Sequence, residues 1–131
     1  MEFFTRQWVE AFAQKWNRDS EMIVPLAQIG FNAIIAFGYP NREEPSVLLE
    51  VKNGKVEHAG LFNKATQMPV TDWDLRALPE QWVAWQSKPL TLSTLGLAVQ
   101  NQQLLFKAGD YRKMMRTPGL ASPFLRFFYL L

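Results

Sequence analysis

Apolar residues recur at helical spacing near the start of the chain. Five of them follow one another at intervals of three or four, namely Phe4, Trp8, Ala11, Phe12 and Trp16. Polar residues fill the intervals, so the pattern predicts an amphipathic helix of about three to four turns. A second helical segment is expected over residues 20–30, interrupted at Pro25 and ended by Gly30.

The middle of the chain has the alternation of β-strands. Residues 31–39 are apolar on both alternating sides, which predicts a strand covered on both faces. In residues 46–62, Asn53-Gly54 separates two β-rich runs, the composition of a tight hairpin turn with positive φ. Residues 70–78 alternate strictly and predict a strand with one face in water. One face carries Thr71, Trp73, Leu75 and Ala77. The face expected in water carries Asp72, Asp74 and Arg76.

The following segments return mainly to helical signals. Residues 79–88 predict a short helix that begins at Pro79 and in which Trp82 and Trp85 share a side. Residues 93–103 predict another amphipathic helix, and residues 104–109 a last short strand.

Asp110 follows Gly109 in a dipeptide typical of a turn. We expect Asp110 to be the N-cap of a helix over residues 110–117.

The last ten residues, SPFLRFFYLL, are the most apolar stretch. Ser122 as N-cap and Pro123 at the first helical position predict a final helix, with Arg126 as its only group that needs water. One stripe of this helix consists of Phe124, Phe127, Phe128 and Leu131. Ten residues are about half of the ~20 needed to span a bilayer, so an integral anchor is disfavoured. We expect the chain's core to cover one side of this helix, and a ligand, a partner or a membrane surface to cover another.

The order of these elements predicts the fold class. Consecutive strands flanked by helices indicate an α+β fold, with a largely antiparallel sheet of about five strands and helices packed over it. A length of 131 residues fits one domain, residues 1–131.

Composition narrows the function classes. The chain has no cysteine, which excludes disulfides, thiol nucleophiles and cysteine metal sites and fits a reducing cytoplasm. Its first residues lack the features of a signal peptide, so we expect no export and a cytoplasmic location. From Leu105 onward the chain has five basic residues and one acidic residue, Asp110. Such a basic patch could bind a phosphate group, or it could simply be a solvated helix surface. No nucleic-acid-binding motif accompanies it, so we do not expect nucleic acid as a partner.

Groups for common catalytic chemistry are sparse. His58 is the only histidine, and we interpret it as a half-buried strand residue. Asp72 and Asp74 lie about 7 Å apart on one face of a strand, a separation that glycosidases use, but Arg76 continues that face and favours solvated cross-strand pairing. The glycines are scattered singly and form no phosphate-binding loop. We therefore expect no enzyme, no metal and no cofactor.

Aromatic residues make up 14% of the chain, with ten Phe and five Trp. This surplus suggests that the helices enclose an apolar cavity on one face of the sheet, lined by rings and flexible thioethers. The candidate lining residues are Phe12, Trp82, Trp85, Met114, Met115, Phe124, Phe127, Phe128 and Leu131.

Three segments resemble the sterol carrier protein type 2 domain, a family of small α+β lipid-binding domains. They are LLEVKNGKVEHA, TDWDLRALPEQWVAWQSKPL and LGLAVQNQQLLFKAGDYRKMM. The positions that match the family pattern are Asn53-Gly54, Asp72 or Asp74, Trp82 and Gly109-Asp110. The chain departs from the family at Ser87-Lys88-Pro89, where a glycine is frequent, and it lacks the peroxisomal tripeptide of many eukaryotic members.

The resemblance implies a five-stranded sheet and an apolar tunnel that binds fatty acyl chains, sterols or other lipids without catalysis. Arg112, Lys113 and Arg116 are then candidates for the polar end of the ligand or for transient contact with a membrane surface. Two alternatives stay open. One is an interaction module, monomer or homodimer, that uses the apolar C-terminal helices. The other is an enzyme that combines His58 with Asp72 or Asp74.

Overall fold

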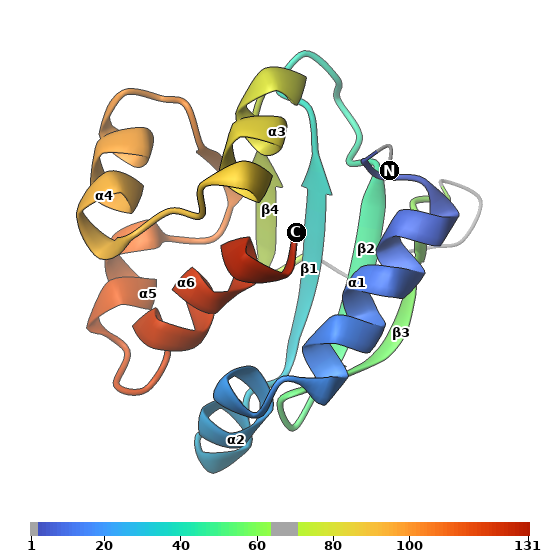
Figure 1. Ribbon diagram of the computed structural model, residues 1–131, viewed down its shortest axis with the longest axis vertical. Coiled ribbons are helices and arrows are strands. Elements are labelled where there is room, and N and C mark those ends of the chain that lie inside the picture. Colours follow the sequence, from blue (N-terminus) through green and yellow to red (C-terminus); the bar gives the residue numbers. More distant parts are fainter. Residues whose placement is uncertain (1–2, 64–70) are drawn as a thin grey trace.

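The structure, a computed structural model, describes residues 3–63 and 71–131. Val70, the first residue of one predicted strand, lies outside these ranges. In chain order the described residues form α1 (Arg6–Arg18), α2 (Ser20–Gln28), β1 (Ala33–Gly38), β2 (Val47–Lys52), β3 (Lys55–Leu61), β4 (Trp73–Arg76), α3 (Pro79–Ser87), α4 (Leu92–Gln100), β5 (Leu105–Ala108), α5 (Tyr111–Arg116) and α6 (Ala121–Leu130) (Figure 1).

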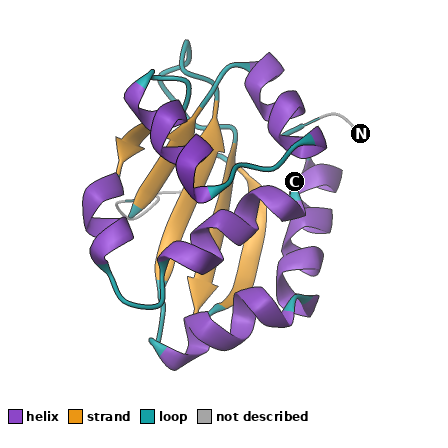
Figure 2. Ribbon diagram, turned by 60° about the vertical axis from the view of Figure 1, so that its left-hand side comes forward, coloured by secondary structure: helices purple, strands orange, loops and turns teal. Residues whose placement is uncertain are grey.

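The five strands form one sheet in the order β3-β2-β1-β4-β5. Only β1 and β4 pair in parallel, and the other neighbours are antiparallel. Helices α1, α3 and α6 lie over one face of the sheet, with α2 at one end and α4 and α5 on the side of β5 (Figures 1 and 2). The predicted α+β class and the largely antiparallel five-stranded sheet are confirmed.

Strand β1 is covered on both faces, as its sequence predicts. Ile35 pairs with Leu49 and with Trp73, and this row lies under the helices. The adjacent row, which contains Ala36, points to the opposite face, and Ala36 is also fully buried. A strand in the centre of the sheet therefore needs apolar residues at nearly every position.

The Asn53-Gly54 turn adopts the predicted positive φ angles, 51° and 87°. It also packs against the end of α2: a Cβ atom at residue 54 would lie 2.7 Å from the backbone N of Ala27. The indole of Trp16 donates a hydrogen bond of 2.8 Å to the carbonyl oxygen of Gly54. The hairpin turn is thus also a docking point for α1 and α2.

Helix α2 is continuous, so the expected interruption at Pro25 is wrong. In a helix of nine residues the proline removes one backbone donor, and the burial of Met22 and Leu26 holds the helix in place. The helix ends near Gly30, as predicted. There the N–H of Phe31 bonds to the carbonyl of Leu26, and the N–H of Gly30 to that of Ala27.

Helix α6 begins earlier than predicted. Its first helical residue is Ala121, and Leu120 is its N-cap without a side-chain hydrogen bond. The backbone explains the shift: the N–H of Leu120 bonds to Thr117, and the carbonyl of Leu120 accepts from Phe124. Ser122 is therefore not the N-cap, and Pro123 lies within the first turn, where a missing N–H costs little.

The sequence suggests that Arg126 is simply hydrated, but in the structure it forms ion pairs. Its Nε donates to Oδ2 of Asp19 at 2.8 Å, and its Nη1 lies 3.2 Å from Oε2 of Glu21. Both acids belong to the start of α2, Asp19 as its N-cap. The ion pairs therefore join α6 to α2.

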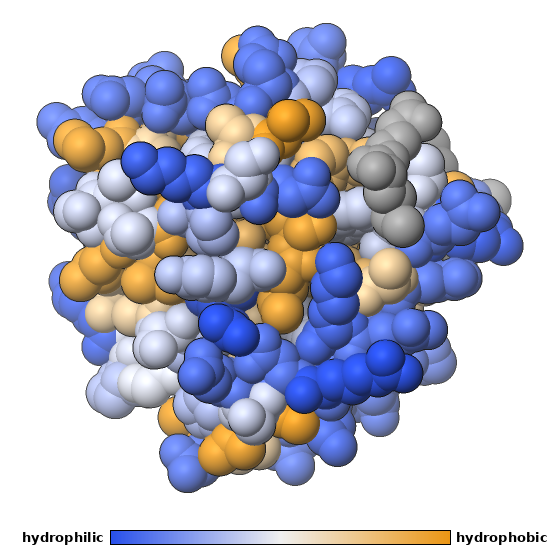
Figure 3. All heavy atoms as spheres, viewed as in Figure 1, coloured by the Kyte–Doolittle hydropathy of each residue, from blue (hydrophilic) through white to orange (hydrophobic). Residues whose placement is uncertain are grey.

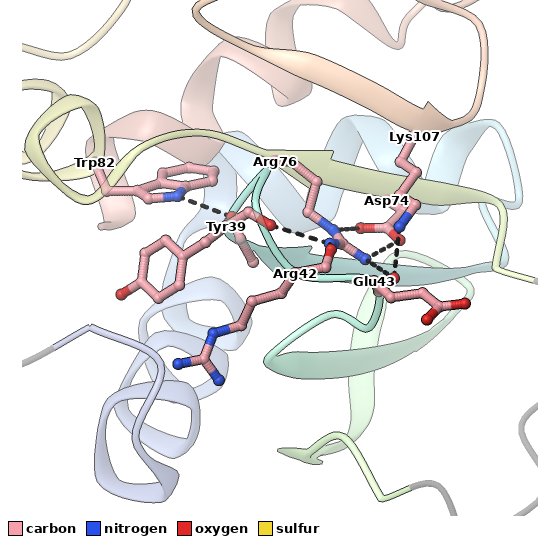
Figure 4. A network of polar contacts seen from close by, with 8 residues as sticks. Tyr39, Arg42, Glu43, Asp74, Arg76, Trp82 and Lys107 are labelled. Carbon is pink, nitrogen blue, oxygen red and sulfur yellow. Dashed lines mark hydrogen bonds and ion pairs between the residues drawn. The ribbon is translucent and has the colours of Figure 1, made fainter.

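The expected wet face of β4 is wrong, because Asp74 and Arg76 are buried. All five N–H groups of the guanidinium have acceptors: two go to the carboxylate of Asp74, and three to backbone carbonyls of the β1–β2 loop (Figure 4). The three carbonyls belong to Tyr39, Arg42 and Glu43, at 3.1, 2.7 and 3.2 Å. Burial is tolerable because the charges pair and every donor is satisfied.

Candidate functional site

The predicted cavity residues come together mainly as an aromatic core under the helices. Ring centroids are 5.5 Å apart for Phe12 and Phe127 and 5.7 Å for Trp85 and Phe128. Trp82 lies 5.4 Å from Trp85, and its indole donates to the carbonyl of Gly38. These rings pack against one another and fill the space between the sheet and helices α1, α3 and α6.

All nine predicted residues but one are buried, and Met115 is partly buried against the same core. The stripe on α6 is covered by the chain itself, including Leu131, whose backbone oxygen accepts from Gln86 at 3.0 Å. An interaction module built on this stripe would need it exposed. The stripe is therefore not a docking surface in this structure, and an interaction module that uses other, exposed residues of the C-terminal helices stays a prediction.

An apolar gap remains at the N-terminal end of α6. The empty space between its side chains is about 160 Å³, some of it open to solvent, and no part of it is wide enough for a water molecule. Two predicted residues, Phe124 and Phe127, line it. The rest of its wall was missed by the sequence-based list: Trp16, Met22, Leu26, Phe31, Trp73, Leu120 and Pro123.

The missed residues did carry a signal. Met22 and Leu26 lie four residues apart, the spacing of one helical face, but the expected break at Pro25 hid that face. Trp73 was placed correctly on the buried side of its strand.

An open groove of about 410 Å³ adjoins the gap on the outside. Apolar side chains, among them Met114, form its floor, and Asn32, Asp72, Asp110, Lys113 and Thr117 supply its polar groups. Phe31, Trp73 and Leu120 line both the gap and the groove, so they form the wall between them. The Phe31 and Trp73 ring centroids are 5.4 Å apart.

Gly109 allows β5 to approach this wall closely. Its φ is +93°, and a Cβ atom there would lie 2.5 Å from Cδ1 of Trp73 and 2.8 Å from the carbonyl oxygen of Asp72. A side chain at this position would displace Trp73, so the shape of the wall depends on this glycine.

The three basic residues proposed for the polar end of a ligand all lie on α5 and are exposed. Lys113 lines the groove, whereas Arg112 and Arg116 do not. Asp110 caps the helix as predicted, its carboxylate accepting from the N–H groups of Arg112 and Lys113.

Two solved structures match this architecture over almost the whole chain. The crystal structure of sterol carrier protein 2 superposes with a TM-score of 0.71 and 18% identity, covering 98% of this chain and 96% of that one. The chain has the sterol carrier protein 2 fold. A conserved hypothetical protein of Thermus thermophilus, suggested to be a sterol carrier protein, superposes with a TM-score of 0.63 and 22% identity, covering 98% and 88%.

At these identities the likeness concerns the fold alone. No protein-family model matches the sequence, and no curated protein matches it either. The resemblance that the sequence motifs indicated is thus confirmed at the level of the sterol carrier protein 2 fold.

Within this fold, the matching motifs have distinct places. Asp72, Gly109 and Asp110 meet in the groove, although β4 and β5 are separated in the sequence by two helices. Trp82 lies in the aromatic core, and the Asn53-Gly54 turn supports α2. Asp74 is tied to Arg76, so Asp72 is the carboxylate that faces the groove.

The residues suggested for catalysis are not brought together. His58 is exposed on β3 and pairs with Glu50, so its expected half-burial is wrong. Asp72 and Asp74 lie three strands away, a separation of about 14 Å. Residues 3–63 and 71–131 contain no group of three or more potential metal-binding side chains. The hypothesis of an enzyme that combines His58 with either aspartate is therefore wrong.

On the face shown in Figure 3, hydrophobic side chains reach the surface in several separate patches between charged residues. Across the described ranges no helix is long and apolar enough to cross a bilayer.

Proposed function

We propose that this chain is a non-catalytic carrier that binds and transfers an apolar molecule, a lipid with a long chain or ring system, in the cytoplasm. The apolar gap between α2, α6 and the sheet supports this proposal, because rings and flexible aliphatic side chains line it without a polar group. The fold supports it too, since one structural neighbour is named as a sterol carrier protein.

Binding requires the gap to widen. Ligand pockets commonly measure about 300–1,000 Å³, whereas the gap contains no space wide enough even for a water molecule. Its α2 wall contains Met22, whose unbranched side chain adapts its shape easily. Partly buried Phe31 lies where the gap meets the groove. Under this proposal, a rotamer change of Phe31 opens the gap toward the groove, and a rotamer change of Met22 widens the gap.

Burial of a saturated chain supplies enough free energy for this change. Each buried methylene contributes about 0.8 kcal/mol, so a 16-carbon chain contributes on the order of 12 kcal/mol. A micromolar dissociation constant requires about 8 kcal/mol. The difference is available for ordering the ligand and widening the gap.

The test has two parts. Purified protein is extracted with organic solvent and its bound lipids are identified by mass spectrometry. In parallel, displacement of a fluorescent fatty acid is titrated. We expect a co-purified lipid and displacement at micromolar concentrations. The absence of both at tens of micromolar would refute the proposal.

Whether the carrier is a monomer or a homodimer stays a prediction for light scattering. Contact with a membrane surface during transfer is also part of the proposal, and vesicle co-sedimentation with and without anionic lipid tests it.

A further inference from the structure

The groove beside the apolar gap has the arrangement needed for the polar end of an amphipathic ligand. The side chains of Phe31, Trp73 and Leu120 line both spaces and therefore lie between them. A chain that enters the gap through this wall leaves its polar end in the groove. This step rests on the proposed function.

The polar groups of the groove retain hydrogen-bonding capacity. Asp72 accepts from the N–H of Ile34 through Oδ2 at 2.8 Å, and its Oδ1 has no partner among the described residues. Asn32 accepts from the N–H of Asn53 through Oδ1, which leaves both amide donors for a ligand. A hydroxyl group, which donates and accepts, matches this set.

The charges of the groove disfavour an anionic end. The groove is lined by two acidic side chains, Asp72 and Asp110, and by one basic side chain, Lys113. The groove continues past Asn32 and Asp72 along a second hollow of about 260 Å³, where Glu50 and Lys52 line it. Lys52 is already paired with Glu50 and Glu57, each at 3.6 Å. Among the described residues that line the two hollows, three carboxylates (Asp72, Asp110 and Glu50) therefore face two lysines (Lys113 and Lys52), and a carboxylate ligand would meet like charges.

We propose that this groove selects apolar ligands with an uncharged hydroxyl end over those with a carboxylate end. Asp72 accepts from the hydroxyl, and Asn32 or Lys113 donates to it. Asp110 adds the negative charge that disfavours the acid.

A direct competition tests the selection. The protein is incubated with equimolar 1-hexadecanol and hexadecanoic acid, delivered from cyclodextrin, and recovered by gel filtration. Mass spectrometry then gives the ratio of retained alcohol to retained acid. We expect the alcohol to exceed the acid about tenfold. In 1 M NaCl, where the screening length falls to about 3 Å, the ratio should approach one.

Variants locate the effect. The double variant D72N/D110N removes both charges, yet the amide oxygen of an asparagine can still accept the backbone hydrogen bonds that Asp72 and Asp110 accept, from Ile34 and at the start of α5. Its ratio should fall to near one. The control E10Q removes one charge at an exposed position of α1, outside the groove, and should keep the wild-type ratio.

Two results would overturn the inference: equal or greater retention of the acid by the wild type, or a ratio that salt and D72N/D110N both leave unchanged. Equal retention of alcohol and acid would refute the selection but not the proposed carrier function. Retention of neither ligand would refute both.

Discussion

The two ends of α6 both bury apolar side chains, but they pack against different neighbours. At the C-terminal end, Phe128 meets the ring of Trp85, and Gln86 binds the backbone oxygen of Leu131. At the N-terminal end, Leu120 and Pro123 border the apolar gap. The difference lies in the neighbours: α3 offers broad rings that interlock, whereas α2 offers Met22 and Leu26, which leave space beside Phe124.

This difference assigns separate roles to the two ends. The packed end carries stability, because interlocked rings cannot move without loss of contacts on several elements. We expect the loose end to be the more adaptable one, because it contains Met22, whose unbranched side chain changes its shape at small cost. Ligand entry is therefore expected at the α2 end.

Truncation at the packed end should have the largest effect. Trp82 is fully buried and touches the rings of Phe4, Phe37 and Trp85. Trp82→Ala is expected to lower the free energy of unfolding by about 3–5 kcal/mol. Met22→Ala at the loose end should cost about 2 kcal/mol and increase ligand uptake. Urea denaturation measures both, and equal losses would contradict the comparison.

Enlarging a buried side chain should have the second-largest effect and should differ between a residue beside the gap and one in the packed core. Leu26→Phe adds volume beside the gap and is expected to change stability by less than about 1 kcal/mol while reducing ligand binding strongly. Leu49→Phe, in the middle of β2, should cost about 1–3 kcal/mol because Leu49 is fully buried and does not line the gap. Thermal unfolding and reporter displacement are measured on both variants. A larger loss of stability in the α2 variant would show that no usable space exists there.

Loss of the ion pairs between α6 and α2 should have the smallest effect on stability. Arg126 is about one third exposed, so Arg126→Gln is expected to cost less than about 1 kcal/mol. The exchange rate of bound ligand, followed by stopped-flow fluorescence, should nevertheless rise several-fold because α2 moves more freely. Arg6→Gln, an exposed change on α1, serves as the control. An unchanged exchange rate would place ligand entry elsewhere.

Local signals in the sequence predicted the elements well. The Asn53-Gly54 turn and the Asp110 cap depend on neighbours within a few residues, and both are confirmed. The wet face of β4 was wrong because the burial of Arg76 depends on a loop more than 30 residues earlier in the chain. The alternation of apolar and polar residues within β4 contains no information about that contact.

The candidate site was predicted only in part for a similar reason. The stripe on α6 was correctly assigned to a buried surface, but burial does not distinguish interlocked rings from the border of a gap. That distinction depends on which helix lies opposite. The position of α2 is fixed by its contacts with the Asn53-Gly54 turn and Arg126, which are distant in sequence.

The guanidinium of Arg76 holds the β1–β2 loop through main-chain oxygens alone, at Tyr39, Arg42 and Glu43. Every residue type supplies such an oxygen. Substitutions at Arg42 and Glu43 therefore leave the anchor intact, and the loop is free to diverge in sequence while its path stays the same.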